Sequence, residues 1–513
     1  MRYNEFKTVI IAVACLSVLS FAALPEMRIT SNGEPNVVTK CNGQPQQVGG
    51  WCMGTTTTEK PYINITNFQL TSHSARNSKP DSIKVRGNST ANATKKPYKI
   101  KFSEKVSLFS KEAAKSWVLL ANFYDATFAL NAMAFELGKR LGLEFTPTSQ
   151  LVDLYINNQY KGIYQLTEQI QSNKGRVDIR EKHKGWLVEF DYHDPEQDER
   201  LSYFKTSKYS MGTFIKAPEL DEMDNPNDST QLRFVKTDIN NLFNKMEEGG
   251  FPNNGYRDLI DLESFAKYVL IQLVMDNSDF NSKFQNGALP GSNYAYKIDS
   301  NKTSKIKAGP LWDFDLAVVT KTSHPRHDYN NYRETIFPTH AFYKRLWEDD
   351  VFKAKYRKIW TKHKKDFEAM TALIDSIKNV AEGSVNNNQW NSGTLNTQTF
   401  NSEITSLKNW WNNRLGYVEQ QLASIDTTKD IISPIIHQQI AGDNRILIIK
   451  NSVNLQVKKF AHFEIYNLNG RLEKSMNFTS GIYNVPLGDL PKGMYVAKVS
   501  FGDGVKVLRV PVM

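Results

Sequence analysis

The sequence predicts an α+β protein in which a two-lobed main domain precedes a small all-β domain. Short alternating segments up to about residue 191 indicate strands, and helical periodicity begins at Asp261. From about Ser433 the chain consists of short alternating segments with Asn-Gly and Asp-Gly turns, which is typical of a small β-sandwich. A length of 513 residues also exceeds one ordinary domain of ~100–200 residues, so several units are expected.

The composition is that of an ordinary globular protein. Hydrophobic residues make up 40% and charged residues 23% of the chain, which excludes a collagen-like, mainly disordered or multi-spanning membrane protein. The net charge of +10 would suit a nucleic-acid binder if the basic residues were concentrated. They are scattered, and the densest stretch, Lys353 to Lys365, has the pattern of a solvated helix face. We therefore expect no nucleic-acid partner.

Residues 1–22 have the features of a secretory signal peptide. Basic residues precede an apolar run, and Ser20 and Ala22 place small side chains at a cleavage site. The run from Val9 to Ala22 is shorter than the ~20 apolar residues that span a bilayer, so a membrane anchor is the weaker alternative. Lipidation at Cys15 is also a poor alternative, because the apolar run continues past it. We expect a secreted chain with no transmembrane helix after cleavage.

Residues 23–60 are polar and rich in Gly, Pro and Thr, so we expect an irregular N-terminal segment there. If Cys15 leaves with the signal peptide, Cys41 and Cys52 are the remaining cysteines of three. An oxidising compartment favours a disulfide between them that closes a small loop. Metal binding by two cysteines alone is the weaker interpretation.

The first half of the main domain is predicted to be mainly strands. In the segment 98–102, Tyr98, Ile100 and Phe102 share one face, while two lysines share the other. In the segment 185–191, Glu189 and Asp191 share a face. The other expected elements are strands at 82–86 and 117–121, a helix at 126–141 that ends at Gly142, and a hairpin of 151–156 and 161–168 around Asn157-Asn158.

The second half is predicted to be mainly helical. Apolar residues recur at helical spacing from Leu262 to Val274, and the helix is expected to stop in the sequence Met275 to Asp279. A hairpin of 294–298 and 305–307 is expected before residues 341–425, which read as largely helical. The last helix carries a core stripe of Leu407, Trp410, Trp411, Leu415, Val418 and Leu422.

Three aspartates are candidates for chemistry. Asp279 follows a helix, and Asp313 and Asp315 lie two residues apart on what we expect to be an extended segment, so their carboxylates would point the same way. Such oxygens are ligands for Mg²⁺ or Ca²⁺. Lys101 could supply positive charge for a phosphate, with Glu168 as its ion-pair partner. Turn capping or surface ion pairing is the alternative for the Asp-x-Asp pair, and the standard nucleotide-binding motifs are absent.

Five segments together resemble the CotH family of atypical protein kinases, named for spore coat protein H. The match covers about residues 61–425 and rests on the order and spacing of these segments, among which Trp-Asp-Phe-Asp is the most specific. The segments are Arg86-Gly87-Asn88-Ser89-Thr90, Lys95 to Phe102, Tyr160 to Glu168, Asn277-Ser278-Asp279, and Gly309-Pro310-Leu311-Trp312-Asp313-Phe314-Asp315.

The resemblance implies a kinase-like fold that binds ATP and Mg²⁺ and phosphorylates Ser residues of a protein. It implies that Asp279 is the catalytic aspartate, and that Asp313 holds Mg²⁺ with Asp315 as the next candidate. The residues implied in ATP binding are Lys101, which would contact the phosphates, Glu168, which would orient that lysine, and Arg86. Members of the family tend to carry an Asn five residues after the catalytic Asp, where this chain has Phe284. Asn281 or Asn286 could substitute.

Residues 433–513 resemble the type A sorting domain of the type IX secretion system. The resemblance lies in Phe463 to Leu472 and in Leu487 to Val499, which includes Leu-Pro-Lys-Gly-Met-Tyr. It implies a Bacteroidetes-type bacterium, the type IX secretion machinery as a partner, and export followed by surface attachment or release. A generic carbohydrate-binding or fibronectin-like module is the alternative.

The leading hypothesis from the sequence is a secreted or surface-attached Ser kinase of the CotH type. Its substrate would be a protein, for which a Ser-rich surface protein is a candidate. The rival is a non-enzymatic kinase-like scaffold, either an adhesin or a component of a polysaccharide-degrading assembly. A phosphohydrolase that uses the aspartate cluster is a third hypothesis.

Overall fold

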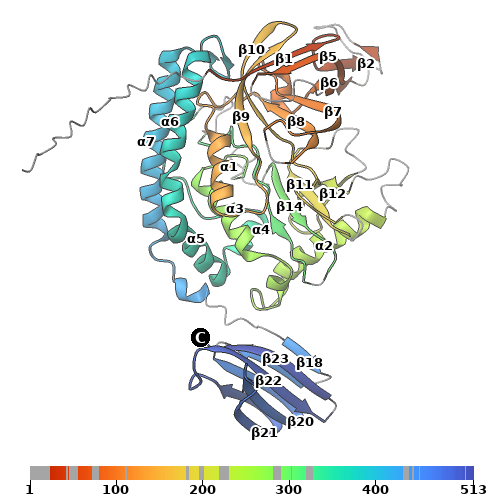
Figure 1. Ribbon diagram of the computed structural model, residues 1–513, viewed down its shortest axis with the longest axis vertical. Coiled ribbons are helices and arrows are strands. Elements are labelled where there is room, and N and C mark those ends of the chain that lie inside the picture. The colour runs from red at the N-terminus through yellow and green to blue at the C-terminus, as the bar shows by residue number, and fades with distance from the viewer. Residues whose placement is uncertain are drawn as a thin grey trace, which may run out of the picture. The chain divides into compact units, whose positions relative to one another are not determined.

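A computed structural model describes residues 23–41, 44–45, 56–71, 80–109, 112–180, 184–193, 195, 202–218, 230–280, 291–301, 303–318, 327–430, 438–441, 444–449, 451–502 and 504–512. The chain divides into two compact units. The first runs to Glu348 and continues over Ile359–Ala423, and the second comprises Asp349–Lys358 and the chain from Ser424. Helices and strands are both present in quantity, which confirms the α+β prediction (Figure 1). The predicted signal peptide and Phe284 lie outside the described residues.

The N-terminal part of the first unit is a closed β-barrel. Its neighbouring strands are antiparallel except β1 and β9, which run parallel. The strands in barrel order are β1 (Glu26–Ser31), β5 (Ile63–Leu70), β6 (Pro80–Val85), β7 (Tyr98–Val106), β8 (Ala114–Leu120), β10 (Gln159–Glu168) and β9 (Ser149–Ile156).

Alternation of side chains builds the barrel core. In β7, Tyr98, Ile100 and Phe102 are buried, whereas Lys101 is exposed on the opposite face, as the period of two predicts. The core also takes in Trp117 of β8 and Tyr164 of β10. The predicted strands in this part of the chain and the hairpin at Asn157-Asn158 are therefore confirmed.

The described residues of the segment 23–60 include four strands, so the prediction of an irregular segment is wrong for them. Strand β1 pairs with β5 and β9, and Met27 and Ile29 are buried in the barrel core. A small sheet with the order β3-β2-β4 follows, formed by β2 (Val38–Cys41), β3 (Gln44–Pro45) and β4 (Thr56–Glu59). The alternating sequence Met-Arg-Ile-Thr is short and borders polar residues, so its strand character depends on partners that lie far away in the sequence.

A five-stranded antiparallel sheet forms the next layer of the first unit. Its central strand is β11 (Trp186–Asp191), whose residues are all buried. The strand order is β12 (Tyr203–Lys205), β13 (Gly212–Ala217), β11, β14 (Asn293–Lys297) and β15 (Lys307–Ala308). Because β11 and β14 are neighbours, the residues that follow β11 and those that precede β14 lie close together.

The apolar stripes predicted at 262–274 and 407–422 lie in two of the described helices, α3 and α7. Helix α3 contacts α1, α7 and β15, and α6 and α7 lie side by side (Figure 1). The helices are α1 (Leu130–Arg140), α2 (Thr230–Glu247), α3 (Leu262–Val274), α4 (Ala341–Leu346), α5 (Asp350–Glu368), α6 (Met370–Ala381) and α7 (Thr397–Leu422). A short hairpin of β16 (Gln389–Trp390) and β17 (Gly393–Thr394) precedes α7.

Helix α1 begins four residues later than predicted. The Asp125 carboxylate accepts hydrogen bonds from the backbone of Thr127 at 2.9 Å and of Leu130 at 2.9 Å. Phe128 has a left-handed backbone with φ of 58°, so the chain turns before the helix starts. The predicted end of the helix at Gly142, whose φ is 72°, is confirmed.

The described chain from Gln438 to Val512 is all-β, as predicted, but its strands form one connected sheet rather than two separate sheets. Strand β20 has a register shift between Val457 and Phe460, and its two halves take different partners, β19 and β22. One hydrogen-bond network therefore links strands that a sandwich would separate. The strands are β18 (Gln438–Ala441), β19 (Asn444–Ile449), β20 (Ser452–Asn467), β21 (Leu472–Pro486), β22 (Gly493–Phe501) and β23 (Gly504–Val512).

Candidate active site

The first unit contains a cavity of about 420 Å³ that is lined by residues of the barrel, of the five-stranded sheet and of the loops after α3 and β15. Its volume falls within the range of ~300–1,000 Å³ that is usual for small-ligand sites. The charged residues that line it are Lys60, Lys84, Arg86, Glu189, Asp191, His193, Lys216, Asp279, Asp313 and Asp315. Four of the sequence-predicted site residues, Arg86 and the three aspartates, are thus brought together.

The loop after α3 places Asp279 in this cavity. Asn277 holds the loop, since its amide donates to the Gln272 side chain at 2.9 Å and to the Asp313 carbonyl at 3.2 Å. The Asn277 side-chain oxygen in turn accepts the Asp279 backbone N–H at 3.2 Å. One asparagine thereby ties the Asp279 loop to the Trp-Asp-Phe-Asp segment.

Asp313 and Asp315 lie in a turn, so the predicted extended segment is wrong. Asp313 has a left-handed backbone with φ of 62°, and residues 315 and 316 form a turn. The buried Phe314 fixes this turn, because its backbone N–H donates to the Asn131 side chain at 2.9 Å. Both carboxylates line the cavity.

Asp191 is a site residue that the sequence reasoning did not assign. Its carboxylate accepts hydrogen bonds from the backbone N–H groups of Tyr192 at 2.7 Å, His193 at 3.1 Å and Ser292 at 2.9 Å. The Ser292 hydroxyl donates to Asp313 at 3.1 Å, so Ser292 connects the two aspartates. The available signal was the pair of carboxylates on one face of the predicted strand.

Burial is the main cause of the raised pKa values of the three predicted aspartates. Burial raises the pKa of Asp279 well above its usual range, and the charges of Asp313 and Asp191 add to this effect. The pKa of Asp315 is also raised well above its usual range by burial, then by Asp313 and Asp279. Burial raises the pKa of Asp313 as well, although Arg86 opposes the rise. Positive charge in the cavity would stabilise the ionised forms of all three.

Positive charge in the cavity comes from Arg86, which directly follows β6, and from Lys60, Lys84 and Lys216. The Arg86 guanidinium lies over the Trp312 ring, 5.4 Å from its centroid, next to the Asp313 segment. After Arg86 the chain turns at Gly87, whose φ is 84° and where a Cβ atom would lie 2.6 Å from the Thr90 hydroxyl. This Gly-Asn-Ser-Thr loop lines the same cavity, so it could contact an anionic ligand.

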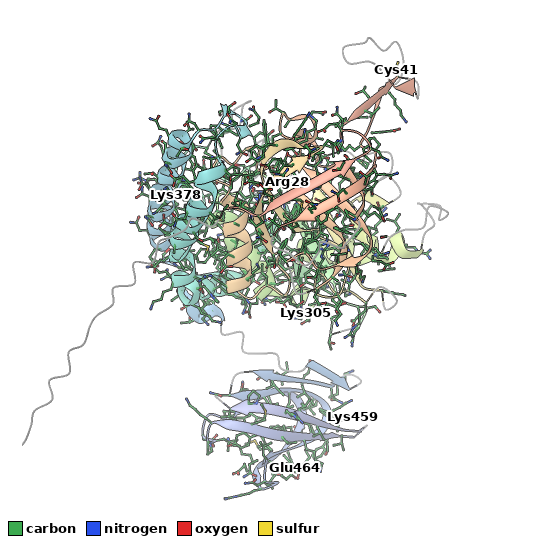
Figure 2. All side chains as sticks on the ribbon, turned by 45° about the horizontal axis from the view of Figure 1, so that its top comes forward. Arg28, Cys41, Lys305, Lys378, Lys459 and Glu464 are labelled. Atoms are coloured by element: carbon green, nitrogen blue, oxygen red, sulfur yellow. The ribbon has the colours of Figure 1, made fainter. Side chains whose placement is uncertain are left out.

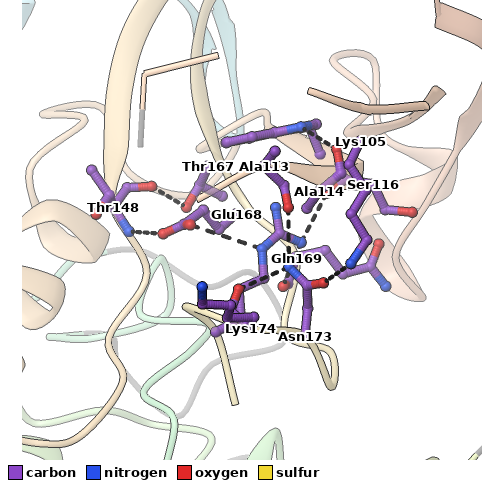
Figure 3. Close-up of polar contacts among 12 residues, drawn as sticks. Lys105, Ala113, Ala114, Ser116, Thr148, Thr167, Glu168, Gln169, Asn173 and Lys174 are labelled. Atoms are coloured by element: carbon purple, nitrogen blue, oxygen red, sulfur yellow. Dashed lines mark hydrogen bonds and ion pairs between the residues drawn. The ribbon is translucent and has the colours of Figure 1, made fainter. Parts of the chain in front are cut away.

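Lys101 and Glu168 do not form the predicted pair. Lys101 is exposed on β7 and is not among the residues that line the cavity. Glu168 is buried, accepts the Thr148 backbone N–H at 2.8 Å, and lies 3.8 Å from the Arg176 guanidinium (Figure 3). Glu168 is the last residue of β10 and lies next to Arg176 of the segment that follows, whereas Lys101 is exposed on β7.

Cys41 is disulfide-bonded and ends strand β2 in the small three-stranded sheet (Figure 2). Its predicted partner, Cys52, lies outside the described residues.

No three His, Cys, Asp or Glu side chains among the described residues are close enough to form a complete metal site. Mg²⁺ does not need one, because it usually binds through one or two carboxylates together with water and substrate phosphates. Asp313 and Asp315 supply two partly buried carboxylates with raised pKa values beside a cavity of ligand size. This donor set is compatible with Mg²⁺.

Comparison with known protein families gives two matches. The CotH kinase protein family matches residues 83–418, and the secretion system C-terminal sorting domain matches residues 449–512. No curated protein matches the chain. Among the residues that the structure describes, no helix is long and apolar enough to cross a membrane. The type IX sorting domain indicates secretion, interaction with the secretion machinery and attachment at the cell surface. The chain belongs to the CotH kinase protein family and is exported by means of a C-terminal sorting domain.

Proposed function

We propose that this protein is an exported protein kinase that transfers the γ-phosphoryl group of ATP to Ser residues of a protein substrate. The observation that carries the proposal is that Asp279, Asp313, Asp315, Arg86 and the Gly-Asn-Ser-Thr loop line one cavity. Phosphoryl transfer requires a base near the acceptor, carboxylates for a divalent ion, and positive charge for the phosphates. The cavity offers all three types of group.

Arg86 and Lys84 are the proposed contacts of the ATP phosphates, in place of Lys101. Both line the cavity, and the Gly-Asn-Ser-Thr loop next to Arg86 adds backbone N–H groups and hydroxyls. A guanidinium binds phosphate oxygens with two parallel hydrogen bonds, which orients them as well as attracting them. Glu168 takes no part in ATP binding in this proposal, since its charge is matched by Arg176.

Asp313 and Asp315 would hold Mg²⁺, the cofactor of the proposed reaction. When bound, Mg²⁺ neutralises charge on the transferred phosphoryl group. Ser292 keeps the Asp313 carboxylate in place through its 3.1 Å hydrogen bond, and Asn131 fixes the turn between the two aspartates. The protein thus supplies a pre-arranged pair of carboxylates, which lowers the entropic cost of positioning the ion and the phosphoryl group.

Asp279 would accept the proton of the acceptor hydroxyl. The raised pKa of Asp279, caused by burial and then by Asp313 and Asp191, makes its ionised form a stronger base than an exposed aspartate. Positive charge from Arg86 and from the bound ion would keep it ionised at neutral pH. Asn277 holds the backbone of the Asp279 loop, and Asp279 lines the cavity.

Transfer of label from γ-labelled ATP to protein tests the proposal. Asp279→Asn should lower the rate by ~10²–10⁴-fold, the usual contribution of a positioned base. Asp153→Asn is a matched control, because burial also raises the pKa of Asp153 but this residue does not line the cavity. Equal labelling by the wild type and Asp279→Asn would contradict the assignment.

The presence of Phe284 where the family tends to carry Asn favours one alternative, a non-enzymatic surface scaffold. Titration calorimetry with ATP and Mg²⁺ separates the two. Binding heat that is lost in Arg86→Ala supports the kinase, whereas no heat from the wild type supports the scaffold.

A further inference from the structure

Tyr192 follows strand β11 directly and reaches across to the proposed catalytic base. Its hydroxyl donates to the Asp279 carboxylate over 3.4 Å. The side chain lines the cavity and is 37% exposed, so it is accessible from solvent while one end touches Asp279. A Ser hydroxyl of a substrate would have to make the same hydrogen bond to Asp279.

The position of Tyr192 is fixed by its neighbours. Its backbone N–H donates to the buried Asp191 carboxylate at 2.7 Å, which anchors the main chain. Its ring lies against Gly291, where a Cβ atom would be 2.5 Å from the ring atom Cε1 of Tyr192. The Gly291 backbone N–H also donates to the Asp279 carbonyl at 3.0 Å. The tyrosine and the Asp279 loop therefore meet at one glycine that leaves room for the ring.

Other hydroxyls of the cavity have different partners. Ser292 donates to Asp313 at 3.1 Å, and Tyr294 donates to Glu189 at 2.7 Å. Tyr124 interacts with the Ser89 side chain. Within the described part of the chain, Tyr192 is the cavity hydroxyl with a hydrogen bond to Asp279.

We propose that Tyr192 is a phosphorylation site of the protein itself, modified within the same molecule at the cavity described above. The inference rests on the proposed kinase function. The Tyr192 oxygen would attack the γ-phosphorus of ATP, the bond from that phosphorus to the β–γ bridging oxygen would break, and ADP would leave with the electron pair. The hydroxyl proton would pass to the Asp279 carboxylate. The products are phosphotyrosine and ADP.

The surroundings of Tyr192 agree with this role. Burial raises the pKa of Tyr192, and the carboxylates of Asp279 and Asp191 raise it further, so the hydroxyl keeps its proton until a base removes it. After transfer, the phosphate would carry about −1.5 to −2 charges beside Asp279 and Asp313. Repulsion would then drive the modified side chain away from Asp279. Modification of Tyr192 would thus clear the base for a Ser hydroxyl of a protein substrate.

The test is site-resolved mass spectrometry of the purified full-length protein after incubation with ATP and Mg²⁺. We expect phosphate on Tyr192, formed with a rate constant that does not change when the protein is diluted tenfold. Tyr160 is a matched internal control, because it is also 37% exposed and also donates to an aspartate, Asp153, at 2.8 Å. We expect at least ten times less phosphate on Tyr160, since Asp153 does not line the cavity.

Two variants complete the test. Tyr192→Phe should abolish the phosphotyrosine at position 192. Tyr160→Phe should leave the amount of phosphate on Tyr192 unchanged. Gly291→Ala keeps the hydroxyl but displaces the ring, so the rate at Tyr192 should fall at least fivefold.

The possible contrary results separate failure of this inference from failure of the proposed kinase function. Phosphate on Ser or Thr without phosphate on Tyr192 would overturn this inference and leave the kinase function standing. A rate that falls in proportion to dilution would also overturn it, since the transfer would occur between molecules. Absence of phosphate from every residue, together with no transfer to added protein, would overturn both the inference and the proposed function.

Discussion

Replacement of Arg176 by Met should destabilise the first unit strongly, because it leaves the Glu168 carboxylate buried without its ion-pair partner. Arg176 lies 3.8 Å from Glu168, and its side chain is fully buried in the described structure. The guanidinium also donates to the backbone carbonyls of Ser116 at 2.9 Å and Gln169 at 3.1 Å. It lies over the Trp117 ring, 5.0 Å from the centroid.

The size of the effect follows from these contacts. Two unit charges 3.8 Å apart attract by about 4 kcal/mol at an effective dielectric of ~20. Loss of one partner of a buried pair typically costs about 3–5 kcal/mol, because the other charge stays desolvated. Two lost hydrogen bonds to carbonyls act in the same direction. We expect Arg176→Met to lower the free energy of unfolding by about 3–5 kcal/mol.

Denaturant unfolding followed by tryptophan fluorescence measures this change. All nine tryptophans precede residue 424, and none lies in 349–358, so the signal reports the first unit. A double-mutant cycle of Arg176→Met with Glu168→Gln should give a coupling of at least 2 kcal/mol. The cycle of Lys101→Met with Glu168→Gln should give a coupling near zero. A large Lys101–Glu168 coupling, or none for Arg176–Glu168, would refute the assignment of the pair.

Further predictions concern pH, ATP binding and the support of Asp313. Burial lowers the pKa of Lys95 to about 7, although Asp125 opposes the change. Between about pH 7 and pH 10.5 the unfolded chain therefore binds more protons than the folded chain, so the free energy of unfolding rises with pH, by on the order of 3–5 kcal/mol at most. Lys95→Met should remove this rise from denaturation curves measured at several pH values. Burial lowers the pKa of His340 to about 4; stability should fall as the pH drops from about 6.5 to 4, less so in His340→Phe, as thermal unfolding would register. In initial-rate assays, Arg86→Ala should lower kcat/KM for ATP by about 10–100-fold, whereas Lys101→Met should change it less than about twofold. A larger loss in Lys101→Met than in Arg86→Ala would show that Lys101 is the phosphate contact. Ser292→Ala removes a hydrogen bond to Asp313 and should reduce kcat by up to about tenfold; unchanged kcat would show that this contact has no role.

Local sequence pattern predicted most of the strands and helices correctly, but it did not predict which of them lie next to one another. The alternation in 98–102 predicted β7 and its buried face correctly. The helix Thr230–Glu247 was not predicted, although Leu232, Val235, Ile239, Leu242 and Phe243 follow helical spacing and are buried. The late start of α1 depends on side-chain capping by Asp125, which spacing alone does not reveal.

The sequence predicted the three aspartates of the candidate site but did not predict Asp191 or the partner of Glu168. Motifs identified Asp279, Asp313 and Asp315, and the fold places them in one cavity. Asp191 joins them because β11 pairs with β14, and no local pattern specifies which strands are neighbours. The pairing of Lys101 with Glu168 rested on charge complementarity and on the order of the motifs, neither of which reveals that the fold brings Arg176 next to Glu168.

The central claim is that this cavity transfers phosphate from ATP to protein by way of Asp279. The most direct measurement compares phosphoryl transfer by the wild type and Asp279→Asn at saturating ATP, with ATP affinity of both proteins determined by calorimetry. We expect similar ATP affinity and a loss of transfer of at least 10²-fold in the variant. Equal transfer by both proteins, or binding of ATP without transfer by either, would contradict it.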